Sequence, residues 1–288
     1  MTLRDLVRSL PPGPLRLLRA VRSRAQEWSP RRLVRHRRHL RLNRDAPPGE
    51  MVLRPGLRLA VGPEARESFE WFCFRSPEMV DELDAFLAHS RDRRRFLDVG
   101  ACHGLFSLAF TQGRPGAEAV AVEPSLLAWE VLEPTLRRNP EARVTPVRAA
   151  LGAAPGTLVM RYSWHHLEAS PEAAGDPDAV EIPVRTSDDL RDELGFHPDL
   201  VKIDVEGYEI AVLQGASRTL REDRPVLFLE VHPGRIVHLG GSMAEIAGLL
   251  DDLDYAVFDL AGRPARLAAV SAVSRFRCEP RSGPSAKK

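Results

Sequence analysis

The chain has 288 residues, enough to bury the core of one large α/β domain. Its 43% hydrophobic and 28% charged residues are typical of a globular protein, and no uninterrupted apolar stretch of about eighteen residues predicts a membrane span. Cys73, Cys102 and Cys278 are too widely spaced for a disulfide framework or a zinc site of paired cysteines. The N-terminus also lacks the continuous apolar run of a secretory signal, so we expect a cytoplasmic protein.

The N-terminal arm is strongly basic. Residues 1–45 hold 13 arginines and a net charge of +10, whereas the rest of the chain carries −9. Apolar residues at helical spacing between arginines predict a basic amphipathic helix over residues 11–26. Such an arm suits an anionic partner, either nucleic acid or a membrane surface. The chain contains only three lysines, however, so we interpret the arm mainly as ordinary arginine usage, with membrane-surface contact as the alternative to nucleic acid.

The body of the chain shows the alternation of an α/β fold. A helix is expected to begin at Ser76-Pro77-Glu78. After it, short apolar runs bounded by turn residues are each followed by a helical stretch, which predicts a doubly wound, mostly parallel sheet. The expected strands cover residues 96–99, 119–123, 143–148, 200–204 and 226–231. Their nearly unbroken apolar character is typical of central parallel strands.

Two further features interrupt or close this pattern. Residues 157–162 and 180–185 alternate between apolar and polar positions and predict an inserted β-hairpin. Residues 243–253 are expected to form a helix, and residues 256–260 with 267–273 to form a final antiparallel pair.

A glycine turn after the first expected strand predicts a cofactor site. Asp98, Gly100 and Gly104 follow the spacing Asp-x-Gly-x-x-x-Gly, and glycines there let a ligand approach the backbone closely. A pyrophosphate site would need glycine at position 102, which is cysteine, and the carboxylate of Asp98 would repel phosphate. The turn therefore favours a cationic ligand without phosphate, such as S-adenosylmethionine, whose amino group Asp98 would attract.

The next two strands supply further cofactor contacts. Glu123 ends the second strand about 20 positions after the glycine turn, where an acidic side chain accepts hydrogen bonds from ribose hydroxyls. Ala149 follows the third strand and is small enough for an adenine ring to lie against the backbone.

Acidic side chains cluster after the fourth and fifth strands. Asp204 and Glu206 follow one strand, and Glu230 and His232 end the next. Because ligands of open α/β sheets bind at the carboxyl ends of the strands, these residues are expected to meet at the reacting group.

These motifs together resemble the FkbM family of methyltransferases. The resemblance covers residues 76–232 and rests on several short stretches: Ser76-Pro77-Glu78, the Asp98-Val99-Gly100-Ala101 turn, Asn139, the Val201–Glu209 block, Leu213-Gln214-Gly215-Ala216, and Leu229-Glu230-Val231-His232. It implies a class I methyltransferase fold, S-adenosylmethionine as cofactor, and methylation of a hydroxyl on a sugar, glycan or natural product. The cofactor residues it implies are Asp98, Gly100, Gly104 and Glu123, to which we add Ala101 of the same turn and Ala149 after the third strand. The catalytic residues it implies are Asp204, Glu206, Glu230 and His232.

The general base stays open at this stage. His232 has a side-chain pKa suited to accepting a proton at neutral pH, and Asp204 is the alternative. The alternative for His232 is a structural histidine that caps the fifth strand. The alternative for Glu206 is a cap of the helix that follows it. Magnesium bound by Asp204, Glu206 and Glu230, with Asp188 or Asp189, would activate the hydroxyl directly.

The resemblance also suggests how the chain is divided. Residues 51–278 are expected to form the methyltransferase domain, residues 1–50 an arginine-rich, partly helical or disordered extension, and residues 279–288 a disordered tail. Two other functions remain open: a methyltransferase-like binding module anchored by the arm, and an RNA 2′-O-methyltransferase. An RNA 2′-O-methyltransferase typically uses a catalytic lysine, whereas Lys202 lies within an expected strand and not at its end. The oligomeric state is left open.

Overall fold

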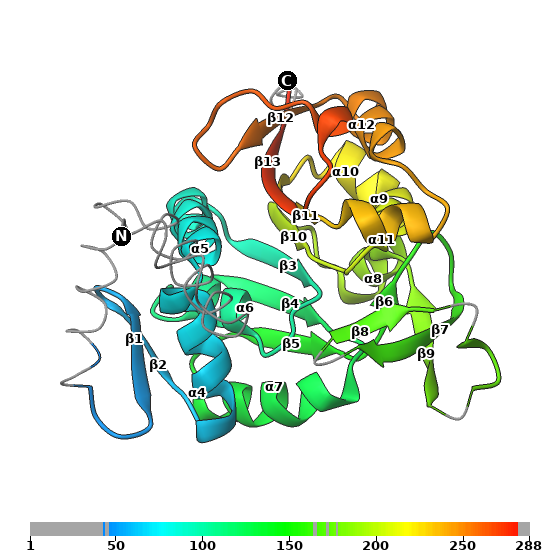
Figure 1. The fold of residues 1–288 in the computed structure, drawn as a ribbon. Coiled ribbons are helices and arrows are strands. Elements are labelled where there is room, and N and C mark those ends of the chain that lie inside the picture. The colour runs from blue at the N-terminus through cyan, green and yellow to red at the C-terminus, as the bar shows by residue number, and fades with distance from the viewer. Residues whose placement is uncertain (1–42, 44–45, 164–165, 171–172, 177, 282–288) are drawn as a thin grey trace, which may run out of the picture.

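The computed structural model describes residues 43, 46–163, 166–170, 173–176 and 178–281 (Figure 1). The helix expected over residues 11–26 lies outside the described residues. Within them, no helix is both long enough and apolar enough to cross a membrane.

The core of the molecule is a seven-stranded sheet (Figure 1). Its strand order is β12-β13-β11-β10-β3-β4-β5, and β13 alone runs antiparallel to its neighbours β11 and β12. The strand order reverses at β3, because β4 and β5 follow on one side of it and β10 and β11 on the other. A ligand is therefore expected in the crevice at the carboxyl end of β3. The strands are β3 (Arg95–Val99), β4 (Glu118–Val122), β5 (Val144–Val147), β10 (Leu200–Ile203), β11 (Val226–Val231), β12 (Tyr255–Asp259) and β13 (Ser274–Pro280).

Helices cover both faces of this sheet. On one face, Phe86, Phe96, Phe110 and Phe228 form an aromatic cluster that anchors the first helices to β3 and β11. The helices of the N-terminal half are α4 (Pro63–Glu70), α5 (Pro77–Ser90), α6 (Leu105–Thr111) and α7 (Leu126–Arg138). Those of the C-terminal half are α8 (Ser187–Leu194), α9 (Glu209–Gly215), α10 (Ser217–Glu222), α11 (Pro233–His238) and α12 (Met243–Asp252). A second aliphatic core of the C-terminal half packs on the other face.

The segment before α5 packs into the same hydrophobic core as β3 and β11. It consists of the hairpin β1 (Glu50–Arg54) and β2 (Leu57–Ala60), then α4, then a π-helical turn, Trp71–Arg75. Asn139, the C-cap of α7, ties this segment to that helix, since its side chain both accepts from the backbone N–H of Ala60 and donates to the Ala60 carbonyl.

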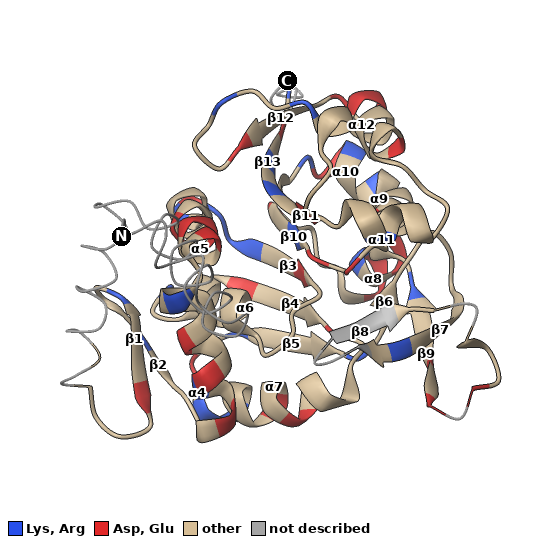
Figure 2. Cartoon of the chain, in the orientation of Figure 1, with Lys and Arg blue, Asp and Glu red and all other residues tan. Residues whose placement is uncertain are grey.

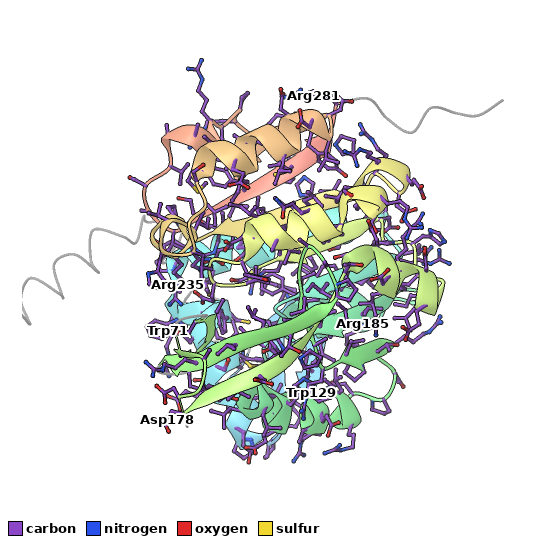
Figure 3. All side chains as sticks on the ribbon, turned by 90° about the vertical axis from the view of Figure 1, so that its right-hand side faces the viewer. Trp71, Trp129, Asp178, Arg185, Arg235 and Arg281 are labelled. Atoms are coloured by element: carbon purple, nitrogen blue, oxygen red, sulfur yellow. The ribbon has the colours of Figure 1, made fainter. Side chains whose placement is uncertain are left out.

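A four-stranded sheet is inserted between β5 and α8. Its order is β6-β9-β7-β8, with β6 (Ala150–Leu151), β7 (Gly156–Ser163), β8 (His166–Ala169) and β9 (Ala179–Arg185). Figure 3 looks onto this sheet. The predicted hairpin is thus confirmed as β7 and β9, and it carries one additional strand on either side.

The five central strands and the helices beginning at Pro77 and Met243 are confirmed. The last predicted strand is wrong. Leu267–Ala269 form a single 3-10 turn that packs with α12, and the strand that closes the sheet is β13, where Phe276 and Cys278 alternate into the core. The predicted C-terminal tail, which starts at residue 279, begins too early, because residues 279–280 belong to β13 and pair with β12. Residues 282–288 lie outside the described residues.

Candidate active site

A cleft of about 700 Å³ lies at the carboxyl ends of the central strands. Its floor comes from the ends of β3, β4, β10 and β11. One wall is α4 with the π-helical turn, including Trp71 and Phe72, and the opposite wall is the inserted sheet with Leu158 and Met160. Two segments flanking the predicted motifs therefore enclose the site.

The glycine turn after β3 is built around close backbone contacts. Gly100 has φ +82°, and a Cβ at this position would lie 1.9 Å from the carbonyl oxygen of Asp204. Gly104 also has φ +82°, and its Cβ would lie 2.6 Å from Leu132. Only glycine fits both places. Gly100 lines the cleft, whereas Ala101 is buried beside it and Gly104 faces α7.

Glu123 lies in the cleft as predicted. Its two carboxylate oxygens accept hydrogen bonds from the backbone N–H groups of Cys102 and Ser125, each at 2.8 Å. Burial raises the pKa of Glu123 to about 7. Ala149 lines the cleft nearby. Each carboxylate oxygen retains a lone pair, so Glu123 can still accept hydrogen bonds from a ligand's hydroxyls.

Asp98 is placed differently from the expectation. It is 1% exposed and does not line the cleft. Its Oδ2 accepts from the hydroxyl of Ser107 at 2.7 Å and from its backbone N–H at 3.1 Å. Burial raises the pKa of Asp98 to about 6. Asp98 thus ties the first turn of α6 to β3, and its contact with a cofactor amino group stays a prediction.

Asp204 lines the cleft and is paired with Lys202. The lysine ammonium lies 2.8 Å from Asp204 Oδ2, although Lys202 itself is 2% exposed within β10. Burial alone would raise the pKa of Asp204, but the charge of Lys202 holds it below its usual value. Asp204 is therefore a carboxylate at neutral pH, with a side chain that remains 23% exposed.

Glu230 also lines the cleft and is held by Arg275, its direct cross-strand partner in β13. Arg275 Nη2 donates to Glu230 Oε1 at 2.6 Å, and Arg275 Nε donates to Glu82 Oε2 of α5 at 2.9 Å. Glu230 Oε2 is buried and has no hydrogen-bond partner among the described residues. Burial, followed by the charges of Asp204 and Glu82, raises the pKa of Glu230 to about 8.

His232 lies behind these carboxyl groups rather than in the cleft. Its Nδ1 lies 2.7 Å from Oε1 of Glu209, which is completely buried, and its Nε2 lies 3.2 Å from Glu206 Oε2. Burial lowers the pKa of His232, but the bond to Glu209 and the charge of Glu206 raise it overall. Glu206 lines the cleft with φ +53° and also pairs with Arg235 at 3.3 Å.

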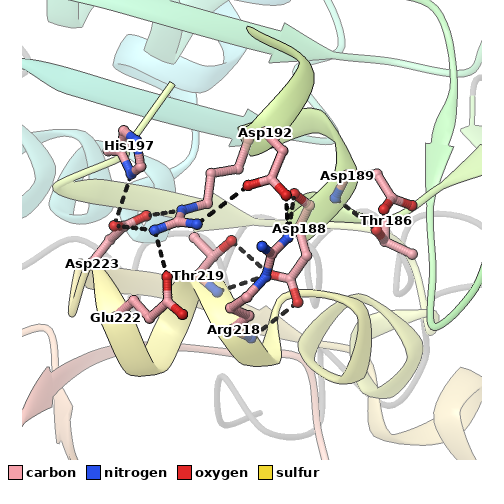
Figure 4. A network of polar contacts seen from close by, with 10 residues as sticks. Thr186, Asp188, Asp189, Asp192, His197, Arg218, Thr219, Glu222 and Asp223 are labelled. Carbon is pink, nitrogen blue, oxygen red and sulfur yellow. Dashed lines mark hydrogen bonds and ion pairs between the residues drawn. The ribbon is translucent and has the colours of Figure 1, made fainter. Parts of the chain in front are cut away.

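Asp188 and Asp189 belong to a different polar network, whose contacts join α8 to α10 (Figure 4). The N-cap of α8 is Thr186, whose hydroxyl accepts from the backbone N–H of Asp189. The carboxylate of Asp188 caps α10 by accepting from the backbone N–H groups of Arg218 and Thr219. Neither aspartate can join a magnesium site with Asp204.

The remaining magnesium ligands do not fit either. Side-chain atoms of Asp204, Glu230 and His232 come within 4.8 Å of one another. However, the carboxylates already face Lys202 and Arg275, and both nitrogens of His232 face other carboxylates. Fixed ammonium and guanidinium groups thus occupy the positions that a hard cation would need. We assign no metal ligand in this cleft.

Sequence reasoning missed several residues of the site. Glu82 and Arg275 carry no motif that marks them, and Glu209, the last residue of the Val201–Glu209 block, has no predicted role. Lys202 has a signal that was available: it is the one lysine in the body of an arginine-rich chain, and it interrupts an apolar strand. Trp71, on the wall formed by α4 and the π-helical turn, was also missed. It is 49% exposed and lies along one edge of the view in Figure 3, together with Arg235.

The strand order, the antiparallel β13 and the cleft beside the glycine turn define a class I methyltransferase fold. The model of the methyltransferase FkbM domain matches residues 98–257, more than half of the chain. The chain therefore belongs to the FkbM methyltransferase family.

Individual relatives are more distant. The chain is 28% identical over 157 residues to the methyltransferase sdnD of Sordaria araneosa, covering 42% of this chain and 60% of that protein. Among solved structures, the FkbM methyltransferase of Methylobacillus flagellatus matches with a TM-score of 0.44 and 20% identity, covering 65% of this chain and 44% of that one. An O-methyltransferase of Bacillus cereus, solved with SAH, matches with a TM-score of 0.41 and 13% identity, covering 75% and 85%.

Proposed function

We propose that the protein is an S-adenosylmethionine-dependent O-methyltransferase acting on a hydroxyl of a sugar, glycan or natural-product small molecule. The observation that carries this proposal is the contact between the glycine turn and Asp204. The turn at Gly100 abuts the backbone of Asp204, so one cleft joins a cofactor-type turn to a carboxylate. Family membership supports the methyl transfer, and the oxygen acceptor is our inference from the cleft.

The cleft residues fit this cofactor. Gly100 leaves the backbone open, Glu123 offers acceptors for ribose hydroxyls, and Ala149 leaves room for a flat ring. S-adenosylmethionine would supply a methyl group bonded to a positively charged sulfur. The Asp204 carboxylate at the end of β10 would attract such a charge, and the carboxyl group of Glu230 lines the cleft beside it.

Asp204 is the residue we propose as general base. Its carboxylate is ionised, exposed to the cleft and fixed by Lys202, so it can accept the hydroxyl proton as the oxygen attacks the methyl carbon. His232, our first choice from the sequence, has both ring nitrogens occupied by Glu209 and Glu206. We therefore propose that His232 positions Glu206 and Glu230 instead.

The cleft itself suits a small acceptor. Apolar side chains of Trp71, Phe72, Leu158 and Met160 face each other across it, and Arg75 is the one Lys or Arg side chain among the described residues that line it. α4 contributes Glu64 and Glu67 to the same rim (Figure 2). A polyanionic RNA would meet repulsion there, which favours a neutral or cationic acceptor.

Calorimetric titration with S-adenosylmethionine, with NADH as control, tests the proposal. We expect saturable binding of the first ligand alone, and methyl transfer from labelled cofactor to a panel of hydroxylated glycosides and polyketides. Asp204→Asn should lower kcat by roughly 100-fold or more while S-adenosylhomocysteine still binds. The O-methyltransferase proposal fails if neither S-adenosylmethionine nor S-adenosylhomocysteine binds.

A further inference from the structure

The ion pairs below the cleft form two groups with different charge balance, joined by one longer contact of 3.8 Å between His232 Nε2 and Glu230 Oε1. In the first group, the carboxyls of Glu206 and Glu209 face two cationic partners, Arg235 and the imidazole of His232. Its charges therefore cancel when His232 is protonated.

The second group is one cation short. It contains three carboxyl groups, Glu82, Asp204 and Glu230, but only two cations, Lys202 and Arg275. Lys202 Nζ lies 2.8 Å from Asp204 and 3.9 Å from Glu82, while Arg275 bridges Glu82 and Glu230. Glu82, Lys202 and Glu230 are at most 3% exposed, the Arg275 side chain is 11% exposed, and Asp204 faces the cleft.

Burial makes this deficit costly. An uncompensated carboxylate out of water is strongly destabilised, and such a group binds a proton instead. The group left over is Glu230, because Arg275 divides its charge between two partners and Glu230 Oε2 has no hydrogen-bond partner among the described residues. Burial raises the pKa of Glu82 as well, so both ends of the Arg275 bridge favour the proton.

We propose that the group of Glu82, Lys202, Asp204, Glu230 and Arg275 binds one proton in the cofactor-free protein and releases it when a sulfonium cation enters the cleft. Glu230 is then a residue that distinguishes S-adenosylmethionine from S-adenosylhomocysteine, whose sulfur is uncharged. The step is balanced: the carboxylic acid loses its proton to solvent, and the sulfonium supplies the missing positive charge. This inference rests on the proposed function.

Other titratable groups near the cleft respond to both ligands alike. Glu123 would face the ribose, which S-adenosylmethionine and S-adenosylhomocysteine share, and Asp98 does not line the cleft. Titratable and charged groups surround Glu230 and the cleft on every neighbouring element: Glu82 on α5, Asp98 on β3, Cys102 and His103 in the turn, Glu123 after β4, Lys202, Asp204 and Glu206 around β10, Tyr208 and Glu209 at the start of α9, His232 and Arg235 after β11, and Arg275 on β13. The difference between the two ligands therefore isolates the effect of the sulfonium charge.

The test is calorimetry of both ligands with the full chain at pH 7, in phosphate and in Tris, whose ionisation heats differ. We expect S-adenosylmethionine to release about 0.9 proton more than S-adenosylhomocysteine, as a carboxyl with a pKa of about 8 is mostly protonated there. The ratio of the two affinities should rise by roughly 50-fold between pH 6 and pH 8 and then level off.

Two variants sharpen the result. Glu230→Gln removes the titrating group, and Glu82→Gln removes the excess carboxyl without touching the cleft, so both should abolish the difference in proton release. Each ligand's own ionisation cancels between wild type and variant. Equal proton release by the two ligands in the wild type, or an unchanged difference in Glu230→Gln, overturns the inference while leaving the proposed function intact. Absence of binding by both ligands overturns both.

Discussion

The carbonyl oxygen of Asp204 occupies the space that a side chain at Gly100 would need, since a Cβ there would lie 1.9 Å from it. The glycine turn after β3 and the carboxyl end of β10 are therefore in direct backbone contact. This contact sets the distance between the glycine turn and the backbone of Asp204 without the help of any side-chain rotamer.

Gly100→Ala should accordingly disrupt the site. Either the turn or the end of β10 must move, and φ of +82° adds strain for alanine, so we expect a loss of about 1–3 kcal/mol in unfolding free energy. Binding of S-adenosylhomocysteine should weaken by at least about tenfold, measured by calorimetry. Gly248→Ala in α12 is the matched control. It has open space and should stabilise the protein by about 0.5–1 kcal/mol in urea unfolding.

Glu123→Gln tests the ribose contact. The variant keeps the size of the side chain, but an amide NH2 group replaces one of the two carboxylate oxygens that accept from Cys102 and Ser125. Both adenosyl ligands should therefore bind more weakly by about 10- to 100-fold. Calorimetry of both ligands measures this. Glu133→Gln, a change in a half-exposed pair with Arg137, should alter neither affinity. A selective effect on one ligand would contradict the assignment of Glu123 to the shared ribose.

His232→Ala should lower the free energy of unfolding, because the role of His232 is structural. Glu209 is completely buried, and losing the imidazole leaves its carboxylate without its 2.7 Å partner. Breaking a buried pair by removing one member costs about 3–5 kcal/mol, which urea unfolding measures. Adding Glu209→Gln should recover part of this loss. His197→Ala, at an exposed histidine beside Asp223, should change stability by less than about 1 kcal/mol. A His232→Ala protein of wild-type stability would refute this structural role.

Stability of the ligand-free protein should fall as pH rises from 7 to 9. Burial raises the pKa of Glu123 to about 7 and of Glu230 to about 8, so the folded state holds these protons more tightly than the unfolded chain does. That contribution is complete below the unfolded pKa near 4.5 and is lost as pH rises through the folded values. The raised pKa of His232 acts in the same direction. Urea midpoints at each pH measure the trend, and Glu230→Gln should flatten it; midpoints that rise toward pH 9 would contradict it.

Turnover should not depend on magnesium. Lys202 and Arg275 already occupy the positions beside Asp204 and Glu230 that a divalent ion would need. Dialysis against EDTA is therefore expected to leave kcat within about twofold, and added magnesium should restore nothing. A loss of activity with EDTA that magnesium alone reverses would show that the cleft rearranges around an ion.

Much of this molecule follows from local sequence. Apolar runs without polar interruption determine β3, β4, β10 and β11, because parallel strands covered on both faces tolerate few polar residues. The carboxyl-end rule for open sheets then brings Glu123, Asp204 and Glu230 to one edge, and all three line the cleft.

What only the tertiary structure decided is which partners these groups have. Glu230 meets Arg275 through the register of β11 against β13, and Arg275 meets Glu82 across 193 residues of chain. Asp98 faces Ser107 instead of the cleft, and His232 faces Glu209. Such pairings depend on the register between strands and on which helix covers which face of the sheet. Both are determined by long-range packing, whereas periodicity within a segment reports only which side of that segment is apolar.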